Sequence, residues 1–208
     1  MSLQGWLVFA AFWVVFVTTP GPNAVNCISN GMSFGFRRSL WGVAGILTQA
    51  TAFLILSALG VTALVAASPV AFFWAKLAGA GVLIWLGVRG WMNAGRPVHS
   101  GAGSAHGLYW RALAVATFNV KSVAGYLAAF SQFVQPDIPI WTQMQAILPT
   151  ALTITALSYC TYTALGAGLG RLALGAVLNR WFRRAMAACF IGYGVALGVL
   201  SAPQIERG

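Results

Sequence analysis

The chain has 208 residues, of which 59% are hydrophobic and 7% are charged, and its formal net charge is +10. Soluble domains carry about 25% charged residues, so this composition excludes an ordinary soluble protein and predicts an integral membrane protein. The basic residues lie at the ends of apolar stretches, not on one face or in a tail, which argues against a nucleic-acid partner.

Long apolar stretches predict an all-α protein with six transmembrane helices. About 20 apolar residues span a bilayer, and the sequence divides into such helices at residues 4–28, 40–66, 70–91, 111–134, 145–170 and 184–202. The first lacks the basic start of a cleavable signal peptide, so we expect it to be retained. We therefore expect one transmembrane domain over residues 1–208.

The basic residues predict the orientation of these helices. The second and fourth connections carry only the charge of Asp137, whereas arginines flank or fill the first, third and fifth, namely Arg37, Arg38, Arg96, Arg111, Arg171, Arg180, Arg183 and Arg184. Cytoplasmic loops are enriched in Lys and Arg, so we expect the arginine-rich loops in the cytoplasm and both chain ends outside. The same arginines are expected to contact membrane lipid.

Sequence echoes between the two halves predict an internal repeat. SALG at residues 57–60 resembles TALG at 163–166, and residues 81–87 share a Gly/Leu/Gly pattern with 192–198. We therefore expect a three-helix unit used twice, at about 1–95 and about 111–208, with a loop at about 96–110. A unit with three spans is inverted the second time it crosses the membrane. Many secondary transporters are built from such inverted repeats and bind substrate near the midplane.

Glycines four residues apart predict close helix contacts. They occur at Gly31 and Gly35, Gly166 and Gly170, and Gly194 and Gly198. Such pairs let two helix backbones approach each other. We expect them to pack helices within the chain, and a dimer face is the alternative use.

The motif Thr-Pro-Gly-Pro-Asn at residues 19–23 predicts a break in the first helix. Pro20 and Pro22 remove backbone donors, and Gly21 relaxes the backbone between them. Irregular backbone at membrane depth normally lines a cavity, because its polar groups need partners. The alternative is that the helix ends at Thr18 and the asparagines belong to a loop, but the apolar run before the motif is short for a span.

Three asparagines after the break predict a polar helix face. Asn23, Asn26 and Asn30 are spaced three and four apart, so they share one face and are candidates to line an aqueous path. A helix that begins near Pro22 directs free N–H groups and the positive end of its dipole at the break. That arrangement suits a carboxylate.

Lys121 is the deepest charge in the sequence. It lies in the fourth span within Phe-Asn-Val-Lys-Ser, about 15 Å along the helix from Arg111. Intramembrane lysines mark functional sites by default, although near a helix end they can extend to the surface. We expect Lys121 to face a cavity beside Asn119. Gln49 in the second span is a candidate for either substrate contact or a bridge between helices.

These motifs resemble the lysine-exporter (LysE/RhtB) superfamily of amino-acid efflux transporters. The resemblance covers essentially the whole chain and rests on TPGPN in the first span, Gly42 and Gly45 in the second, KLAGAGVLIWLG from Lys76, and FNVKS with SQF in the fourth. It implies an exporter of amino acids or close derivatives in the bacterial cytoplasmic (inner) membrane, driven by proton or ion exchange and often dimeric. Its motifs fall here on Pro20, Gly21, Pro22, Asn119 and Lys121.

Two family prolines are replaced in the fourth span. Val120 stands where the family has proline between Asn119 and Lys121, and Ser131 replaces the proline before Gln132. Because proline is a strong helix breaker, these replacements argue against a symmetric second break. They also make it unsafe to transfer a substrate from the family.

The leading hypothesis is an alternating-access exporter whose substrate contacts Pro20, Gly21, Pro22, Asn23, Asn26, Gln49, Asn119 and Lys121. The alternatives are a passive channel or a structural subunit of a larger complex. A membrane-embedded enzyme is disfavoured, because no intramembrane His, Asp or Glu is available for catalysis. The same absence weakens proton antiport, which usually uses an intramembrane carboxylate. The three cysteines are scattered, so we expect no metal and no cofactor.

Overall fold

A computed structural model describes residues 2–67, 69–95, 107–135 and 137–201 of the chain. These residues form helices and connecting turns, with no strand among them. The helices are α1 (Leu3–Thr18), α2 (Pro22–Ala67), α3 (Pro69–Met92), α4 (Leu108–Thr117), α5 (Val120–Phe133), α6 (Ile140–Leu169), α7 (Arg171–Val177) and α8 (Arg180–Ser201). Most of the predicted loop at 96–110 lies outside the described residues.

The predicted break in the first span is present. α1 ends at Thr18, and Thr19, Pro20 and Gly21 separate it from α2. The asparagines that follow are helical, so the alternative that they belong to a loop is wrong. Pro22 takes the first position of α2, where its missing N–H has no helical partner to lose.

α2 is bent rather than continuous. Gly35 has φ 71° and ψ 170°, which divides the helix into residues 22–34, the inner limb, and residues 36–67, the long limb. A Cβ at Gly35 would meet nothing within 4 Å. Glycine is therefore needed here for its positive φ, which side chains disfavour, and not for close packing.

The fourth span is also broken, which corrects the expectation drawn from its missing prolines. α4 ends at Thr117, and α5 begins at Val120 after Phe118 and Asn119. Asn119 has extended backbone angles of φ −75° and ψ 105°, and its side-chain oxygen accepts the Lys121 N–H at 3.1 Å. This is the geometry of an asparagine N-cap, which starts a new helix without any proline.

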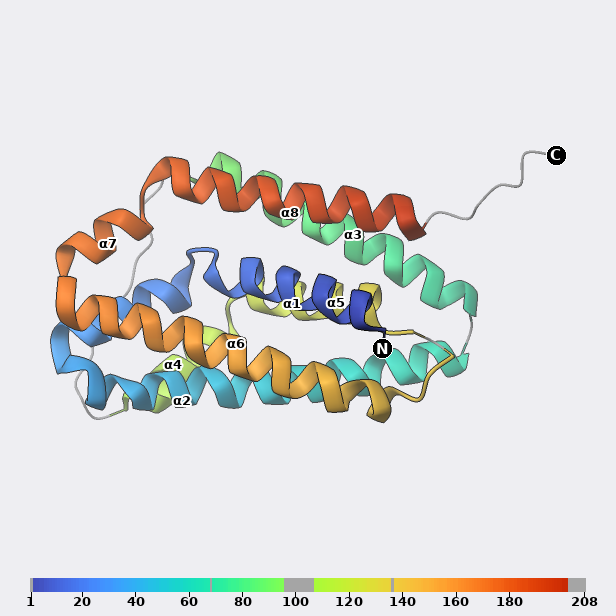
Figure 1. Cartoon of the computed structure of the whole chain (residues 1–208), viewed down its shortest axis with the longest axis horizontal. Helices are drawn as coiled ribbons and strands as arrows, with labels where there is room; N and C mark the ends of the chain where they lie inside the picture. Colours follow the sequence, from blue (N-terminus) through green and yellow to red (C-terminus); the bar gives the residue numbers. More distant parts are fainter. Residues whose placement is uncertain (1, 68, 96–106, 136, 202–208) are drawn as a thin grey trace.

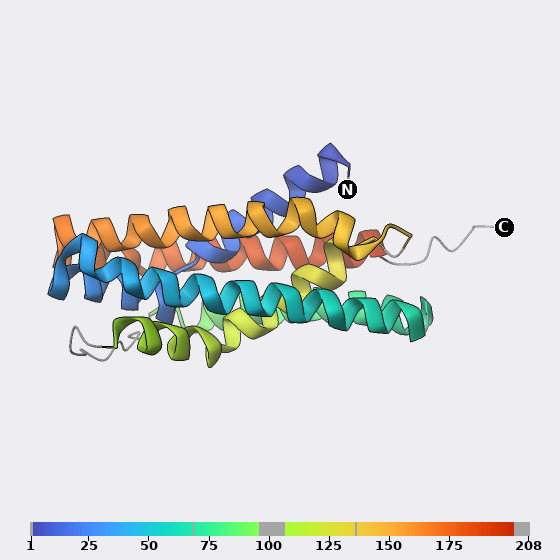
Figure 2. The ribbon, with the colours of Figure 1, turned by 90° about the horizontal axis from the view of Figure 1, so that it is seen from below.

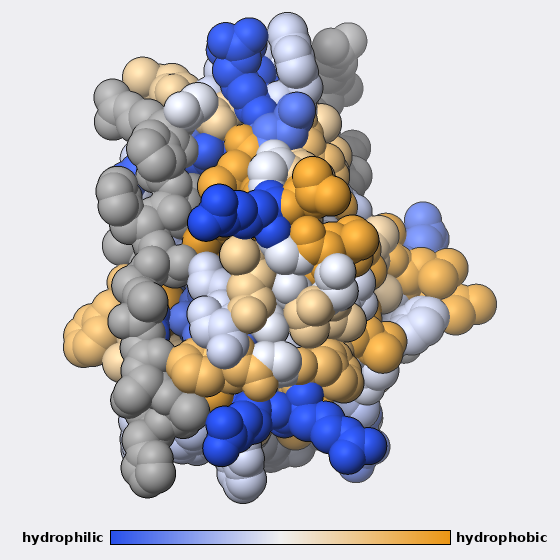
Figure 3. Space-filling model, turned by 90° about the vertical axis from the view of Figure 1, so that its left-hand side faces the viewer, coloured by the Kyte–Doolittle hydropathy of each residue, from blue (hydrophilic) through white to orange (hydrophobic). Residues whose placement is uncertain are grey.

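The helices lie roughly along one common axis (Figure 1). α2 packs against α4 and α6, and α3 packs against α8. The bend in α2, the start of α4 and α7 lie at one end of the molecule, called here the basic end, and the N-terminus and the α5–α6 connection lie at the other (Figures 1 and 2). Strongly hydrophilic side chains lie at several separate places on the basic end, with apolar side chains between them (Figure 3).

Glycines bring several helices into close contact. A Cβ at Gly166 would clash with the backbone of Ile28, and one at Gly31 would clash with the Thr163 carbonyl, so α2 and α6 meet backbone to backbone. Likewise, a Cβ at Gly194 would lie 2.9 Å from the Ala80 carbonyl. The prediction of packing within the chain is thus confirmed for Gly31, Gly166 and Gly194.

The other members of those glycine pairs differ. Gly35 and Gly170 have positive φ and sit at helix junctions, with nothing within 4 Å of a Cβ. A Cβ at Gly198 would be in ordinary contact, 3.5 Å from the Ala80 Cβ.

Within the described ranges, one helix segment is both long and apolar enough to cross a membrane, at Pro22–Gly60. α1 is apolar but shorter. The two breaks account for part of the difference from the six predicted spans, because α4 has 10 residues and α5 has 14. Each is shorter than the roughly 20 residues that a single helix needs.

Candidate functional site

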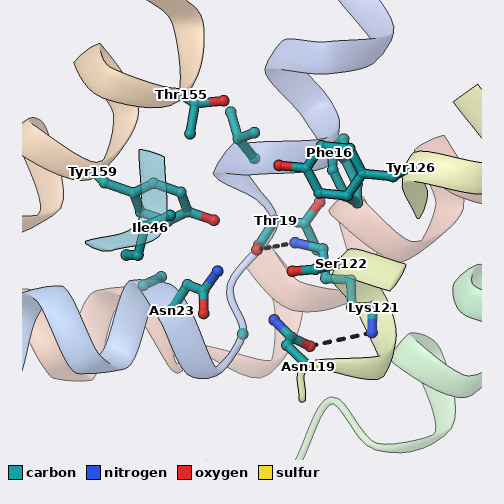
Figure 4. A pocket seen from close by; sticks show the side chains of 13 residues that line it. Phe16, Thr19, Asn23, Ile46, Asn119, Lys121, Ser122, Tyr126, Thr155 and Tyr159 are labelled. Atoms are coloured by element: carbon teal, nitrogen blue, oxygen red, sulfur yellow. Dashed lines mark hydrogen bonds between the residues drawn. The ribbon is translucent and has the colours of Figure 1, made fainter. Parts of the chain in front are cut away.

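The two helix breaks meet at a pocket. Its lining comes from α1, the first break, both limbs of α2, the second break, α5 and α6 (Figure 4). The lining residues are Phe16, Val17, Thr19, Gly21, Asn23, Ala24, Ile46, Asn119, Lys121, Ser122, Tyr126, Thr155 and Tyr159. The empty space among them, including its opening, is about 350 Å³.

Lys121 connects the two breaks. Its Nζ donates a hydrogen bond of 2.6 Å to the Thr19 carbonyl, and its backbone N–H donates to the side-chain oxygen of Asn119 (Figure 4). The ammonium also lies 5.3 Å from the centroid of the Phe16 ring and 6.0 Å from that of Phe190. Both distances fall in the range of cation–π attraction.

The described residues offer the Lys121 ammonium no carboxylate. Their one acidic side chain, Asp137, lies in the α5–α6 connection at the end of the molecule opposite the basic end. A buried charge without a counter-ion is costly unless other polar groups or a ligand stabilise it. Here a carbonyl and two aromatic rings stabilise the cation, and none of them is an anion. The ammonium can therefore still bind an anionic group.

The carbonyls released by the first break have side-chain partners. The Tyr162 hydroxyl donates to the Thr18 carbonyl at 2.6 Å, next to the bond between Lys121 and Thr19. Further along α1, the Trp13 indole N–H donates to Thr155 Oγ1 at 3.0 Å. These bonds tie the end of α1 to α5 and α6, so the break has a defined geometry.

Amide side chains beside the pocket have unused hydrogen-bonding capacity. Asn23 is 4% exposed and pairs with the Tyr159 hydroxyl, yet its Oδ1 has no partner among the described residues. Asn26 has neither Oδ1 nor Nδ2 paired, and Gln49 has an unpaired Nε2. Buried polar groups rarely remain unpaired in proteins, so water or a ligand is expected at these amides.

The structure brings together four of the eight predicted site residues. Gly21, Asn23, Asn119 and Lys121 line the pocket. The other four lie outside its lining: Pro20, Asn26 and Gln49 are buried, and Pro22 is exposed at the start of α2.

Sequence reasoning missed most of the pocket wall. Thr155 and Tyr159 are four residues apart on α6, a spacing that marks a shared polar face, and Ser122 follows Lys121 directly. Phe16 and Tyr126 look like core residues, and only the fold shows that their rings also border the pocket. In the described part of the chain, no cluster of three His, Cys, Asp or Glu side chains is placed to hold a metal.

Comparison with known proteins identifies the family. Residues 14–201 match the LysE type translocator family. The chain belongs to this family. A Vibrio cholerae relative described as an uncharacterized membrane protein is 33% identical over 207 residues, covering 97% of this chain and 100% of the relative. Members of the LysE family are efflux transporters and not enzymes. The expectation of a membrane transporter is therefore confirmed.

The names of other relatives of this LysE translocator include several different substrates. A homoserine/homoserine lactone efflux protein of Salmonella typhi is 27% identical over 200 residues, covering 95% of this chain and 97% of its own. A leucine efflux protein of an Enterobacter species is 26% identical, covering 93% of this chain and 88% of its own. No solved structure matches the chain.

Proposed function

We propose that this LysE translocator is a secondary transporter that exports amino acids or close derivatives across the bacterial cytoplasmic membrane by alternating access. The observation that carries the proposal is the Lys121 ammonium, held between two facing helix breaks with no carboxylate partner among the described residues. Names of relatives that include homoserine and leucine efflux agree with this substrate class.

The pocket offers complementary groups for both ends of an amino acid. Lys121 and the N-termini of α2 and α5, which both begin at the pocket, favour a carboxylate. The free Asn23 Oδ1 is an acceptor for an ammonium group, and Tyr126, which also lines the pocket, is a candidate for a cation–π contact with the same group. A substrate carboxylate would replace the Thr19 carbonyl as the partner of Lys121.

The arrangement of the helices supports six spans in two inverted repeats. Each half contains a broken helix followed by two longer helices, and the corresponding helices pair, α2 with α6 and α3 with α8. Inverted repeats that meet at broken helices are a common basis for alternating access. A homodimer remains part of the proposal on the family resemblance alone.

Proton or ion exchange is the proposed driving force. No carboxylate occurs within the described helices, so coupling would have to use groups other than Asp or Glu at membrane depth. Collapsing only the pH gradient across loaded vesicles tests this: a lower efflux rate supports proton exchange, and an unchanged rate excludes it.

The decisive experiment is counterflow in proteoliposomes made from purified protein. We expect saturable uptake of labelled homoserine or leucine that is stimulated by the same amino acid inside, because alternating access exchanges substrate across one site. Flux that neither saturates nor responds to internal substrate would favour a passive channel. Absence of flux for every amino acid tested would favour a structural subunit.

Variants at Lys121 connect that flux to the pocket. Lys121→Met keeps the length of the side chain and removes its charge, so it should reduce counterflow about 10-fold or more, as expected for losing a charged hydrogen bond of about 1.5–3 kcal/mol. Arg89→Met, which removes an exposed cation near the end of α3, is the matched control and should change little. Equal rates for Lys121→Met and the unmodified protein would contradict the site.

A further inference from the structure

The inner limb of α2 carries a buried face of three asparagines that needs an explanation. Asn23, Asn26 and Asn30 are 4%, 2% and 3% exposed. Both polar atoms of Asn26 and the Oδ1 of Asn23 have no hydrogen-bond partner among the described residues. An unpaired buried polar group costs about 1–3 kcal/mol, so three such atoms on one short limb indicate a face that is solvated in some state of the protein.

This asparagine face joins the pocket to the basic end. Asn23 lines the pocket, and Asn30 lies about 10 Å further along the limb, which leads to the bend of α2 at the basic end (Figure 1). Small groups oppose the face at its far end. A Cβ at Gly42 would lie 3.2 Å from Asn30 Nδ2 and 3.7 Å from the Cβ of Ala112 on α4. Gly42 therefore lies directly against the Asn30 amide and places no side chain of its own there.

The opposite side of the pocket is sealed differently. Between the pocket and the N-terminal end lies an aromatic cluster formed by Phe12, Trp13 and Phe16 of α1 with Tyr126 and Phe133 of α5. Its ring centroids are 5.4 Å apart for Phe12 and Phe133 and 5.3 Å apart for Trp13 and Tyr126. The Trp13 N–H is already bonded to Thr155. This cluster leaves few polar atoms for water, unlike the asparagine face.

We infer that the face of Asn23, Asn26 and Asn30 is the passage by which water and substrate reach the pocket from the basic end, and that the aromatic cluster is the barrier on the other side. The identity of the substrate rests on the proposed function. The passage itself does not. In the structure the three asparagine side chains are buried, so the proposed passage is closed. In this proposal it opens when the inner limb and α4 separate.

Cysteine accessibility tests the passage directly. Cys27, Cys160 and Cys189 are first replaced by alanine, and single cysteines are placed by Asn26→Cys, Asn30→Cys, Ile28→Cys or Phe12→Cys. Ile28 is 0% exposed on the same limb but packs against α6, which makes it the matched control. The probe is sulfonatoethyl methanethiosulfonate, an anionic reagent that does not cross membranes, added to inside-out vesicles.

We expect the reagent to modify Asn26→Cys and Asn30→Cys at least about 10-fold faster than Ile28→Cys, because a hydrated passage admits it and helix packing does not. Equal rates for Asn26→Cys and Ile28→Cys would overturn the passage. Fast modification of Phe12→Cys from the same side would overturn the aromatic barrier. Adding homoserine or leucine separates the two proposals: slower modification supports both, whereas fast modification that no amino acid slows supports the passage and contradicts the substrate class.

A second variant avoids the cysteine-free background. Asn26→Leu has a similar volume and removes the unpaired amide, so its thermal unfolding midpoint should equal or exceed that of the unmodified protein. If the amide serves the passage, counterflow should fall about 10-fold, because an apolar group would then block hydration. Unchanged counterflow in a stable Asn26→Leu protein would overturn the inference.

Discussion

At the scale of single residues, Tyr162 and Lys121 perform parallel tasks. Each donates to a carbonyl that the first break releases, at Thr18 and Thr19 respectively. Lys121 lines the pocket, whereas Tyr162 lies outside its lining. The carbonyl at Thr18 therefore has a structural partner, and the carbonyl at Thr19 has one that a substrate can compete for.

Replacing Tyr162 separates these tasks. Tyr162→Phe leaves the Thr18 carbonyl without its donor, which should lower the free energy of unfolding by about 1–3 kcal/mol. For a chain of this size that corresponds to roughly 2–4 °C in the unfolding midpoint per kcal/mol. Scanning fluorimetry of the detergent-solubilised protein measures it. Tyr109→Phe is the control, since its hydroxyl bonds Thr48 at an exposed position. Equal midpoints for both variants would show that the Tyr162 bond contributes nothing.

At the scale of helices, the two breaks show what the sequence predicts and what it leaves open. Pro20 and Pro22 restrict the backbone locally, so the first break could be predicted from the local sequence alone. The second break depends on Asn119, and asparagine is also common inside loops and on polar helix faces. Only the cap from Asn119 to the Lys121 N–H distinguishes these cases, and it depends on the backbone geometry.

The residues of the pocket wall also divide into those that the sequence predicts and those that only the fold reveals. Gly21, Asn23, Asn119 and Lys121 stand out because polar or helix-breaking residues are unusual inside an apolar span. Phe16 and Ile46 are apolar residues in apolar helices, so their position at the pocket depends on how the helices pack. Gln49 and Asn26 are equally conspicuous in the sequence, yet they are buried outside the pocket lining.

Helix pairing provides a test at this scale. Gly166→Ala places a methyl group against the backbone of Ile28, where neither helix can yield, so α2 and α6 should separate. Overpacking of this kind typically costs 1–3 kcal/mol, and we expect a lower unfolding midpoint and less folded protein on size-exclusion chromatography. Gly168→Ala lies two residues away on α6 with nothing within 4 Å of its Cβ, and it should behave as the unmodified protein does. Alanine favours the helix over glycine, so a similar loss in both variants would contradict the role of close packing at Gly166.

At the scale of the whole molecule, the positions of the arginines and of the asparagine face distinguish the same two ends. Arg37 and Arg38 follow the bend of α2, and Arg171 and Arg180 begin α7 and α8, which all lie at the basic end. The inner limb that carries the asparagine face runs from the pocket toward that end, and the aromatic cluster lies on the other side of the pocket. If the basic end faces the cytoplasm, as the distribution of arginines predicts, the passage is on the side from which an exporter collects its substrate.

That orientation predicts opposite labelling of two exposed positions. In the cysteine-free background, Asp137→Cys lies in the α5–α6 connection and Arg38→Cys lies at the basic end. In intact spheroplasts a membrane-impermeant maleimide should modify Asp137→Cys at once, whereas Arg38→Cys should react only after permeabilisation, because the bilayer separates the two ends. Both variants should react fully in detergent, which controls for burial. Labelling of Arg38→Cys in intact spheroplasts would reverse the orientation and would place the asparagine passage on the outer side, where it would serve release of substrate instead of its collection.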